Sequence, residues 1–202
     1  MRLYTIIFVG LMSFGAGTSF AQSRPANSNT KISLTSFQKL AQSCAANVPI
    51  STLEAIARTE SALYPYALSI NRPRQLALRQ GWNRGTITLE RQPASLEEGV
   101  AWTRWLLARG ITVSIGLLQV NSEHASVLHV TPEQLFDPCT NLRSGAALLS
   151  ATYAATARIH GDGFAALDSA LSYYNTGSPT AGFTNGYVQQ VKNHARSLEH
   201  QH

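Results

Sequence analysis

The fold is decided by the stretch from Ser51 to Ser61, which reads STLEAIARTES. Its apolar residues Leu53, Ile56 and Ala57 recur at steps of three and one, along one face of a helix. That face next reaches position 60, where the period predicts a buried aliphatic residue and the chain has Glu60. The sequence therefore predicts an acid on the inward side of a helix.

The ends of this helix also have sequence signals. The Ser51 hydroxyl and the Glu54 carboxylate have the spacing of a capping box, so we expect the helix to begin at Thr52. Pro65 disfavours helical backbone at the residue before it, so we expect the helix to end just after Glu60.

An acid in this position has an unusual environment. The C-terminal end of a helix is the negative end of its dipole, and partial burial removes water from the carboxylate. Both effects raise the pKa of Glu60. The alternative is a surface glutamate on a helix whose buried face lies elsewhere.

The composition predicts one globular domain. The chain has 202 residues, of which 44% are hydrophobic and 13% are charged, so it can bury a core and is not disordered overall. The net charge of +5 suits an anionic partner. The basic residues are scattered and form no block of Lys and Arg, so we do not expect nucleic acid as a partner.

The first 21 residues have the pattern of a secretory signal peptide. Arg2 precedes an apolar run from Leu3 to Phe14, and Ser19-Phe20-Ala21 is a small-x-small cleavage signal. The run is shorter than the roughly 20 residues of a membrane span. We expect cleavage after Ala21 and an exported, periplasmic protein that is not an integral membrane protein. The alternative is a retained N-terminal anchor.

The remaining chain divides into a polar, flexible lead-in at residues 22–33 and a single domain at residues 34–202. Export places the two cysteines, Cys44 and Cys139, in an oxidising compartment. A disulfide between them is favoured over two separate buried thiols.

The fold class is mainly α, or α+β, with six to eight helices. A capping box at Ser95 and another at Thr131 each predict a helix start, and Asp137-Pro138 is expected to end the short helix after Thr131. Alternation from Thr86 to Leu89 predicts a small β-hairpin, the only sheet that we expect. Further helical periods cover residues 37–46, 96–110, 141–159, 164–174 and 186–198.

Two further segments contain candidate ligand-binding residues. SIGLLQVN, residues 114–121, places Gly116 near the amides of Gln119 and Asn121. ALSYYNTG, residues 170–177, joins two aromatic side chains to an amide and a glycine. Aromatic faces and amides suit the apolar faces and hydroxyl rims of a sugar chain. Singly, each segment is also explained as a turn or as a helix end with core tyrosines.

Together, the three motifs resemble those of the Slt-type lytic transglycosylases of the lysozyme-like superfamily. The chain is most similar to the small exported transglycosylases of type IV secretion and conjugation systems, over about residues 40–191. Glu60-Ser61 matches the catalytic Glu-Ser of the family, residues 116–119 its Gly-Leu-Met-Gln, and residues 174–177 its Tyr-Asn-Ala-Gly. Leu118 replaces the usual Met, a nearly volume-conserving change.

The resemblance implies a lysozyme-like fold with one disulfide between Cys44 and Cys139, with Glu60 as the catalytic residue and with no metal or cofactor. The implied partners are peptidoglycan glycan strands and secretion-system components. The implied substrate-binding residues are Ser69, Gln119, Asn121, Tyr174, Asn175 and Tyr187.

The resemblance also implies a reaction that needs one carboxyl group, whereas ordinary glycosidases use two. Protonated Glu60 donates to the glycosidic oxygen between N-acetylmuramic acid and N-acetylglucosamine, and the 2-acetamido group stabilises the cation. Glu60 then accepts the proton of the muramic 6-hydroxyl, which closes a 1,6-anhydro ring without water.

Two other functions compete with this interpretation. A non-catalytic peptidoglycan-binding or assembly protein with a lysozyme-like fold is the main alternative, against which the presence of Glu60 argues. A metal hydrolase is disfavoured because the six histidines show no ligand pair within a known motif.

The segment from Arg72 to Arg91 contains five arginines and matches nothing in the family. We expect it to attract the carboxylates of the substrate; the alternative is a solvated hairpin with no role in capture.

Overall fold

The structure is a computed structural model that describes residues 31–71, 86–89 and 91–199. These parts contain seven α-helices and a four-stranded sheet, which confirms the mainly α fold class. The expected signal peptide, most of the lead-in and most of the arginine-containing segment lie outside the described residues. The helices are α1 (Leu34–Cys44), α2 (Ile50–Ser61), α4 (Leu96–Leu107), α5 (Pro138–His160), α6 (Phe164–Thr176), α7 (Ala181–Thr184) and α8 (Tyr187–Glu199).

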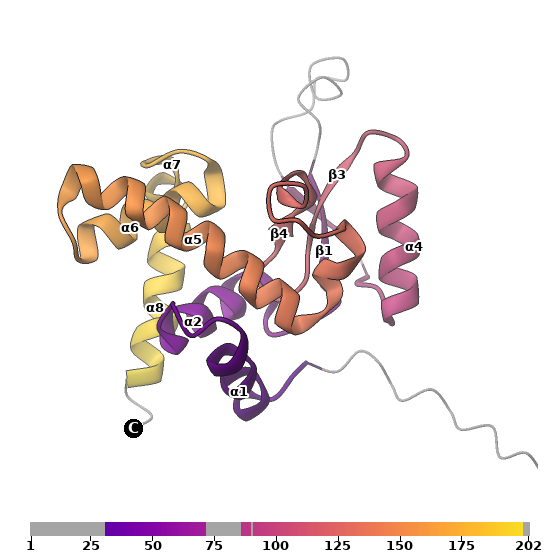
Figure 1. Cartoon of the computed structure of the whole chain (residues 1–202), viewed down its shortest axis with the longest axis horizontal. Helices are drawn as coiled ribbons and strands as arrows, with labels where there is room; N and C mark the ends of the chain where they lie inside the picture. Colours follow the sequence, from indigo (N-terminus) through magenta and orange to yellow (C-terminus); the bar gives the residue numbers. More distant parts are fainter. Residues whose placement is uncertain (1–30, 72–85, 90, 200–202) are drawn as a thin grey trace, which may run out of the picture.

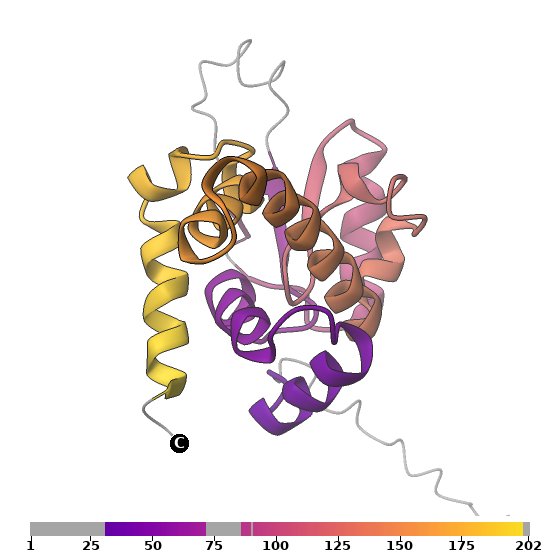
Figure 2. The same cartoon turned by 60° about the vertical axis from the view of Figure 1, so that its left-hand side comes forward.

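The long helix α5 crosses the molecule between two groups of elements (Figure 1). Helices α6, α7 and α8 lie at one end of it, and the sheet and α4 lie at the other end. Helix α2 packs on α8, and α1 packs on α5 (Figure 2). Large buried side chains fill the core between these helices and the sheet, namely Phe37, Leu53, Ile56, Leu68, Ile115, Phe136, Leu142 and Leu171.

The sheet has the order β2-β1-β3-β4, and all neighbouring strands are antiparallel. Strands β1 (Leu68–Asn71) and β2 (Thr86–Thr88) form the expected hairpin. The expectation that this hairpin is the only sheet was wrong, since β3 (Thr112–Ile115) and β4 (Val120–Asn121) extend it. In β3, buried Val113 and Ile115 alternate with the less buried Thr112 and Ser114, as expected for a strand with one face on the core. The two-residue strand β4 pairs with the end of β3.

The capping box expected at Ser51 was also wrong. Helix α2 begins at Ile50 with Pro49 as its N-cap, and no side chain caps it. Glu54 does not return to the start of the helix, because it is 1% exposed and paired with Arg58 one turn later. Glu54 therefore forms an ion pair within the helix and does not take part in a cap.

The short helix after Thr131 ends at Asp137-Pro138 and has its capping box with Gln134, both as expected. This helix, η2 (Pro132–Phe136), is a 3₁₀-helix, and α5 begins at Pro138 instead of the expected residue 141. Asp137 then caps α5 by accepting a hydrogen bond from the Thr140 N–H at 2.8 Å. Pro138 therefore begins the long helix, since the first helical position needs no N–H donor.

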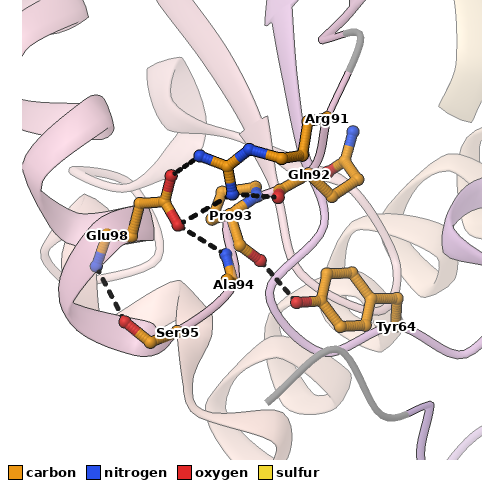
Figure 3. A network of polar contacts seen from close by, with 7 residues as sticks. All are labelled: Tyr64, Arg91, Gln92, Pro93, Ala94, Ser95 and Glu98. Carbon is orange, nitrogen blue, oxygen red and sulfur yellow. Dashed lines mark hydrogen bonds and ion pairs between the residues drawn. The ribbon is translucent and has the colours of Figure 1, made fainter. Parts of the chain in front are cut away.

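A polar network joins Tyr64, just after α2, to residues 91–98 at the start of α4 (Figure 3). Ser95 caps α4 as expected, but the Glu98 carboxylate accepts from the Ala94 N–H and from Arg91 and does not bond the Ser95 N–H. These bonds lower the pKa of Glu98 to about 2, with the Arg91 bond as the largest cause. The hydroxyl of Tyr64, just beyond α2, donates to the Pro93 carbonyl.

The expected disulfide is confirmed. It joins Cys44 at the end of α1 to Cys139 at the start of α5, with the two Cα atoms 5.4 Å apart and 95 positions apart in sequence. Among the described parts of the chain, no helix combines the length and the apolar character that crossing a membrane requires.

Candidate active site

Glu60 lies in the last turn of α2, next to a cavity of about 460 Å³. The helix ends at Ala62, whose φ of 51° lies in the left-handed region, and Leu63 follows with a φ of 67°. This tight reversal carries the chain back along the end of α2. The lining residues are Lys31, Arg58, Thr59, Glu60, Ser61, Ala62, Tyr64, Ala67, Ser69 and Gln92.

Tyr187 holds the carboxyl group of Glu60. Its hydroxyl donates a hydrogen bond of 2.6 Å to Oε1 of Glu60, across 127 positions of sequence. Tyr187 is the first residue of α8 and is 6% exposed, so the packing of α8 on α2 fixes its ring. One carboxylate oxygen is therefore anchored by the protein.

The pKa of Glu60 is raised from 4.5 to about 7, because its surroundings withdraw the carboxylate from water. The Tyr187 hydrogen bond opposes this effect by stabilising the ionised form. Burial, and then the nearby charge of Glu60, raise the pKa of both Tyr187 and Tyr174 well above the usual value for tyrosine. Both tyrosines therefore remain protonated, while Glu60 is poised between acid and base near neutral pH.

Ser61 ties the end of α2 to the loop at residues 116–119. Its hydroxyl lies 3.1 Å from the Ala57 carbonyl within the helix and 2.9 Å from the Leu117 carbonyl of the loop. The residue beside the acid therefore fixes the position of the helix end.

The loop at residues 116–119 is held by Asn141, which the sequence analysis missed. Asn141 is fully buried on α5; its Nδ2 donates to the Ile115 and Leu135 carbonyls, and its Oδ1 accepts from the Leu118 N–H, all at 2.8 Å. Gly116 has a φ of +79°, and a Cβ there would lie 2.4 Å from Asn141 Nδ2. The only sequence signal was a polar residue at the start of an alanine-rich helix.

Gln119 also stabilises this loop. Its backbone has a φ of 48°, and its Nε2 donates to the carbonyls of Ala67 and Gly116 at 3.1 and 3.0 Å. Both amide protons are thus directed at the backbone, which leaves Oε1 as the group that a substrate can use. Its contact with substrate stays a prediction.

Tyr174, from the motif at residues 170–177, supports the same loop that Ser61 and Asn141 hold. Tyr174, on α6, donates a hydrogen bond of 2.7 Å to the Leu118 carbonyl. A Cβ at Gly145 would lie 3.0 Å from this hydroxyl, so the glycine leaves room for it. Tyr187 therefore connects Glu60 to α8, and Tyr174 connects α6 to the loop at residues 116–119.

The remaining predicted site residues are placed differently. Ser69 lines the same cavity as Glu60. Asn121 caps the short 3₁₀-helix η1 (Ser122–His124) through its Oδ1, and exposed Asn175 accepts a hydrogen bond from Asn185. Neither asparagine is among the residues that line the cavity, and their contact with substrate stays a prediction. The sequence analysis missed five polar lining residues, namely Lys31, Arg58, Thr59, Tyr64 and Gln92.

The chemistry of the cavity follows from its charges. Glu60 is the one carboxylic acid among the described residues that line it. In the parts of the chain that the structure covers, no cluster of His, Cys, Asp or Glu could hold a metal ion. A mainly helical domain with a small antiparallel sheet defines the class as a lysozyme-like domain. A catalytic role for its single cavity acid stays a prediction.

Comparison with known proteins identifies the family. Residues 38–197 match the transglycosylase SLT domain, and the chain belongs to that family. It is 36% identical over 178 residues to Protein virB1 of Agrobacterium fabrum (strain C58), which covers 88% of this chain and 66% of that protein.

Other relatives of similar identity are also virB1 proteins. The chain is 33% identical to Protein virB1 of Rhizobium radiobacter, over 94% of this chain and 72% of that protein. It is 35% identical to the type IV secretion system protein virB1 of Brucella abortus (strain 9-941), over 77% of this chain and 62% of the relative. The chain thus spans about two thirds of the length of these relatives.

Proposed function

We propose that the protein is a peptidoglycan lytic transglycosylase. It cleaves the β-1,4 bond between N-acetylmuramic acid and N-acetylglucosamine and releases a 1,6-anhydro product. Membership of the transglycosylase SLT family supports the reaction class.

The observation that carries the proposal is the state of Glu60. Its pKa of about 7 gives a comparable population of acid and carboxylate at neutral pH, and no second carboxyl group lines the described cavity. An enzyme that adds water to a glycosidic bond ordinarily needs a second carboxylate to activate the water or to attack the sugar. One acid suffices when the substrate itself supplies the attacking hydroxyl.

The geometry divides the work between the two oxygens of Glu60. Tyr187 occupies Oε1, so Oε2 is the oxygen that carries the proton toward the substrate. This proton passes to the glycosidic oxygen as the bond from that oxygen to the muramic C1 breaks, and the 2-acetamido group stabilises the cationic centre.

In the second half of the reaction, the muramic 6-hydroxyl attacks C1 and its proton passes to the Glu60 carboxylate. This step restores the acid, and neither half consumes water. A pKa near neutrality suits both steps, because the same group must give and then accept a proton.

The relatives support a more specific role. We propose that the protein is exported to the periplasm, loses its signal peptide and opens the cell wall locally for a type IV secretion or conjugation apparatus. Two observations support this role: the names of the virB1 relatives and the signal-peptide pattern of residues 1–21. Secretion-system components are then its protein partners.

Mass spectrometry of the fragments released from purified peptidoglycan sacculi tests the reaction. We expect 1,6-anhydro ends, which are lighter than the reducing ends of a hydrolase product by one water. A Glu60→Gln variant, purified in the same way, is the control for contaminating enzymes. Reducing ends as the main product would contradict the transglycosylase reaction, and release of no fragments would contradict the enzyme.

A further inference from the structure

We propose that Lys31 makes the catalytic cavity selective for glycan strands that carry carboxylates. This inference rests on the proposed function and adds a specificity-determining residue to it. Lys31 lies outside every motif of the sequence analysis, and it lines the same cavity as Glu60.

The backbone places Lys31 beside the acid. The N–H of the next residue, Ile32, donates a hydrogen bond of 3.0 Å to the Leu63 carbonyl, just beyond the end of α2. Ser33 then caps α1, so hydrogen bonds hold the two residues that follow Lys31. Lys31 directly precedes this segment, and its exposed side chain lines the cavity.

The other cation in the wall is already neutralised. Arg58 donates through Nε and Nη2 to Oε1 of Glu54, at 3.0 and 2.8 Å. Lys31 forms no ion pair with any residue that the structure describes. When Glu60 is protonated, the described wall thus has an excess of one positive charge, on Lys31.

The wall also offers donors that suit an acceptor ligand. Gln92 accepts the Leu68 N–H through Oε1, which leaves its Nε2 as a donor beside the ammonium of Lys31. The hydroxyls of Thr59, Ser61 and Tyr64 donate to backbone carbonyls, so they add no donor to these two groups. A carboxylate can accept hydrogen bonds from both the amide and the ammonium.

In peptidoglycan, carboxylates come from two sources: the lactyl group of muramic acid when it bears no peptide, and the stem peptide when it is present. Both offer the same chemistry to Lys31. Arg91 precedes Gln92 of the cavity wall in sequence. It is paired with Glu98, so it is not available to bind a substrate carboxylate.

The test measures binding of soluble glycan strands to a Glu60→Gln protein, which leaves the strands intact during calorimetric titration. One set of strands has free lactyl carboxylates and a second set has stem peptides. Each is also used after conversion of its carboxylates to primary amides, which removes the charge and keeps the sugars. Lys31→Gln is compared with Lys39→Gln, which alters an exposed lysine on α1.

We expect Lys31→Gln to reduce the preference for carboxylate over amidated strands about three- to fivefold at low ionic strength, and the difference to vanish near 0.5 M salt. Loss with only one set identifies the lactyl or the stem carboxylate as the ligand. Lys39→Gln should keep the original preference. An unchanged preference in Lys31→Gln, or an equal loss with amidated strands, would overturn the proposal.

A parallel assay separates this result from the proposed function. If wild-type protein releases anhydro fragments from sacculi while Lys31→Gln keeps the wild-type preference, only the inference about Lys31 fails. If wild-type protein releases no fragments, the proposed function itself fails.

Discussion

Helix α2 carries two acids in opposite environments, one in each half of the helix. Glu54 is 1% exposed, pairs with Arg58 and accepts a hydrogen bond from Gln38 of α1. Glu60 lies two turns later, borders the cavity and has only the neutral hydroxyl of Tyr187 as a described partner. In the first case the acid is part of an ion pair, whereas in the second case withdrawal from water without a cation favours the protonated acid.

The comparison teaches that burial alone does not make an acid catalytic. The two residues have the same side chain and the same helix, and the partner decides what each can do. We expect Glu54 to contribute to stability and Glu60 to contribute to catalysis, and each of the following experiments tests this division.

The largest effect is expected for Glu60→Gln. The amide keeps the size of the side chain and can still accept the Tyr187 hydrogen bond, but it cannot donate and then accept a proton. We expect a loss of about 10³-fold in the rate of glycan cleavage, with no loss in melting temperature. General acid–base catalysis typically contributes about 10²- to 10⁴-fold to a rate. Cleavage by Glu60→Gln above about a tenth of the wild-type rate would be too small a loss, and it would contradict the assignment.

A smaller free-energy change is expected for Glu54→Ala, which leaves Arg58 without its partner. Breaking a fully buried ion pair costs about 3–5 kcal/mol. Because the Arg58 side chain is 22% exposed, we expect a smaller fall in the free energy of unfolding, of about 2–3 kcal/mol. The measurement is denaturation by urea, with Lys39→Ala as a surface control. If this variant stays as stable as wild type but loses its turnover while folded, the division between the two acids is wrong.

The pH dependence of stability provides a third test. The folded-state pKa of Glu60, about 7, lies above its ordinary value of 4.5, so the folded protein holds an extra proton between these values. The resulting stability is complete below about pH 4.5 and is lost as pH rises through 7. Between pH 5 and 8 we expect wild type to lose about 1–3 kcal/mol relative to Glu60→Gln.

The opposite slope, with Glu60→Gln losing more stability than wild type as the pH rises, would exclude a raised pKa. Thermal unfolding of both proteins in matched buffers is sufficient, because other titrating groups contribute equally to the two curves.

The smallest effect is expected for Tyr187→Phe, which removes the hydrogen bond to Glu60 Oε1. This bond lowers the pKa of Glu60, so its loss should raise the pKa and move the alkaline limb of the pH–rate profile to higher pH. We expect a shift of up to about one pH unit, with a rate loss of about three- to tenfold.

Tyr174→Phe is the matched control, since that hydroxyl donates to the Leu118 carbonyl and not to Glu60. It should leave the alkaline limb in place. Equal shifts in the two variants would show that the Tyr187 hydrogen bond has no particular role.

Much of the fold followed from local patterns. The periods of the long helices, the caps at Ser95 and Thr131, and the hairpin of β1 and β2 each depend on neighbouring residues and were predicted. The start of α2 was mispredicted because Ser51 and Glu54 fit a capping box in isolation, while Arg58, four residues after Glu54, offers a stronger partner.

The sheet was underestimated for a similar reason, since β3 depends on pairing with β1 more than 40 positions away. The inward placement of Glu60 could be predicted from the period of its helix. Its partner Tyr187 could be named only through the family resemblance, and the bond between them spans 127 positions. Asn141 had only the weak signal of a polar residue at the start of an alanine-rich helix, and Lys31 had none. Their roles depend on which segments the fold brings together.

The packing of α8 on α2 also has a consequence for biosynthesis. A chain that emerges from its N-terminus presents α2 early and α8 last among the described elements. Before α8 packs on α2, the burial that raises the pKa of Glu60 is incomplete, so we expect its carboxyl to be mostly ionised at neutral pH. We therefore expect the proposed proton donor to form only when nearly the whole domain has been delivered, and an incomplete chain to leave the cell's own wall intact.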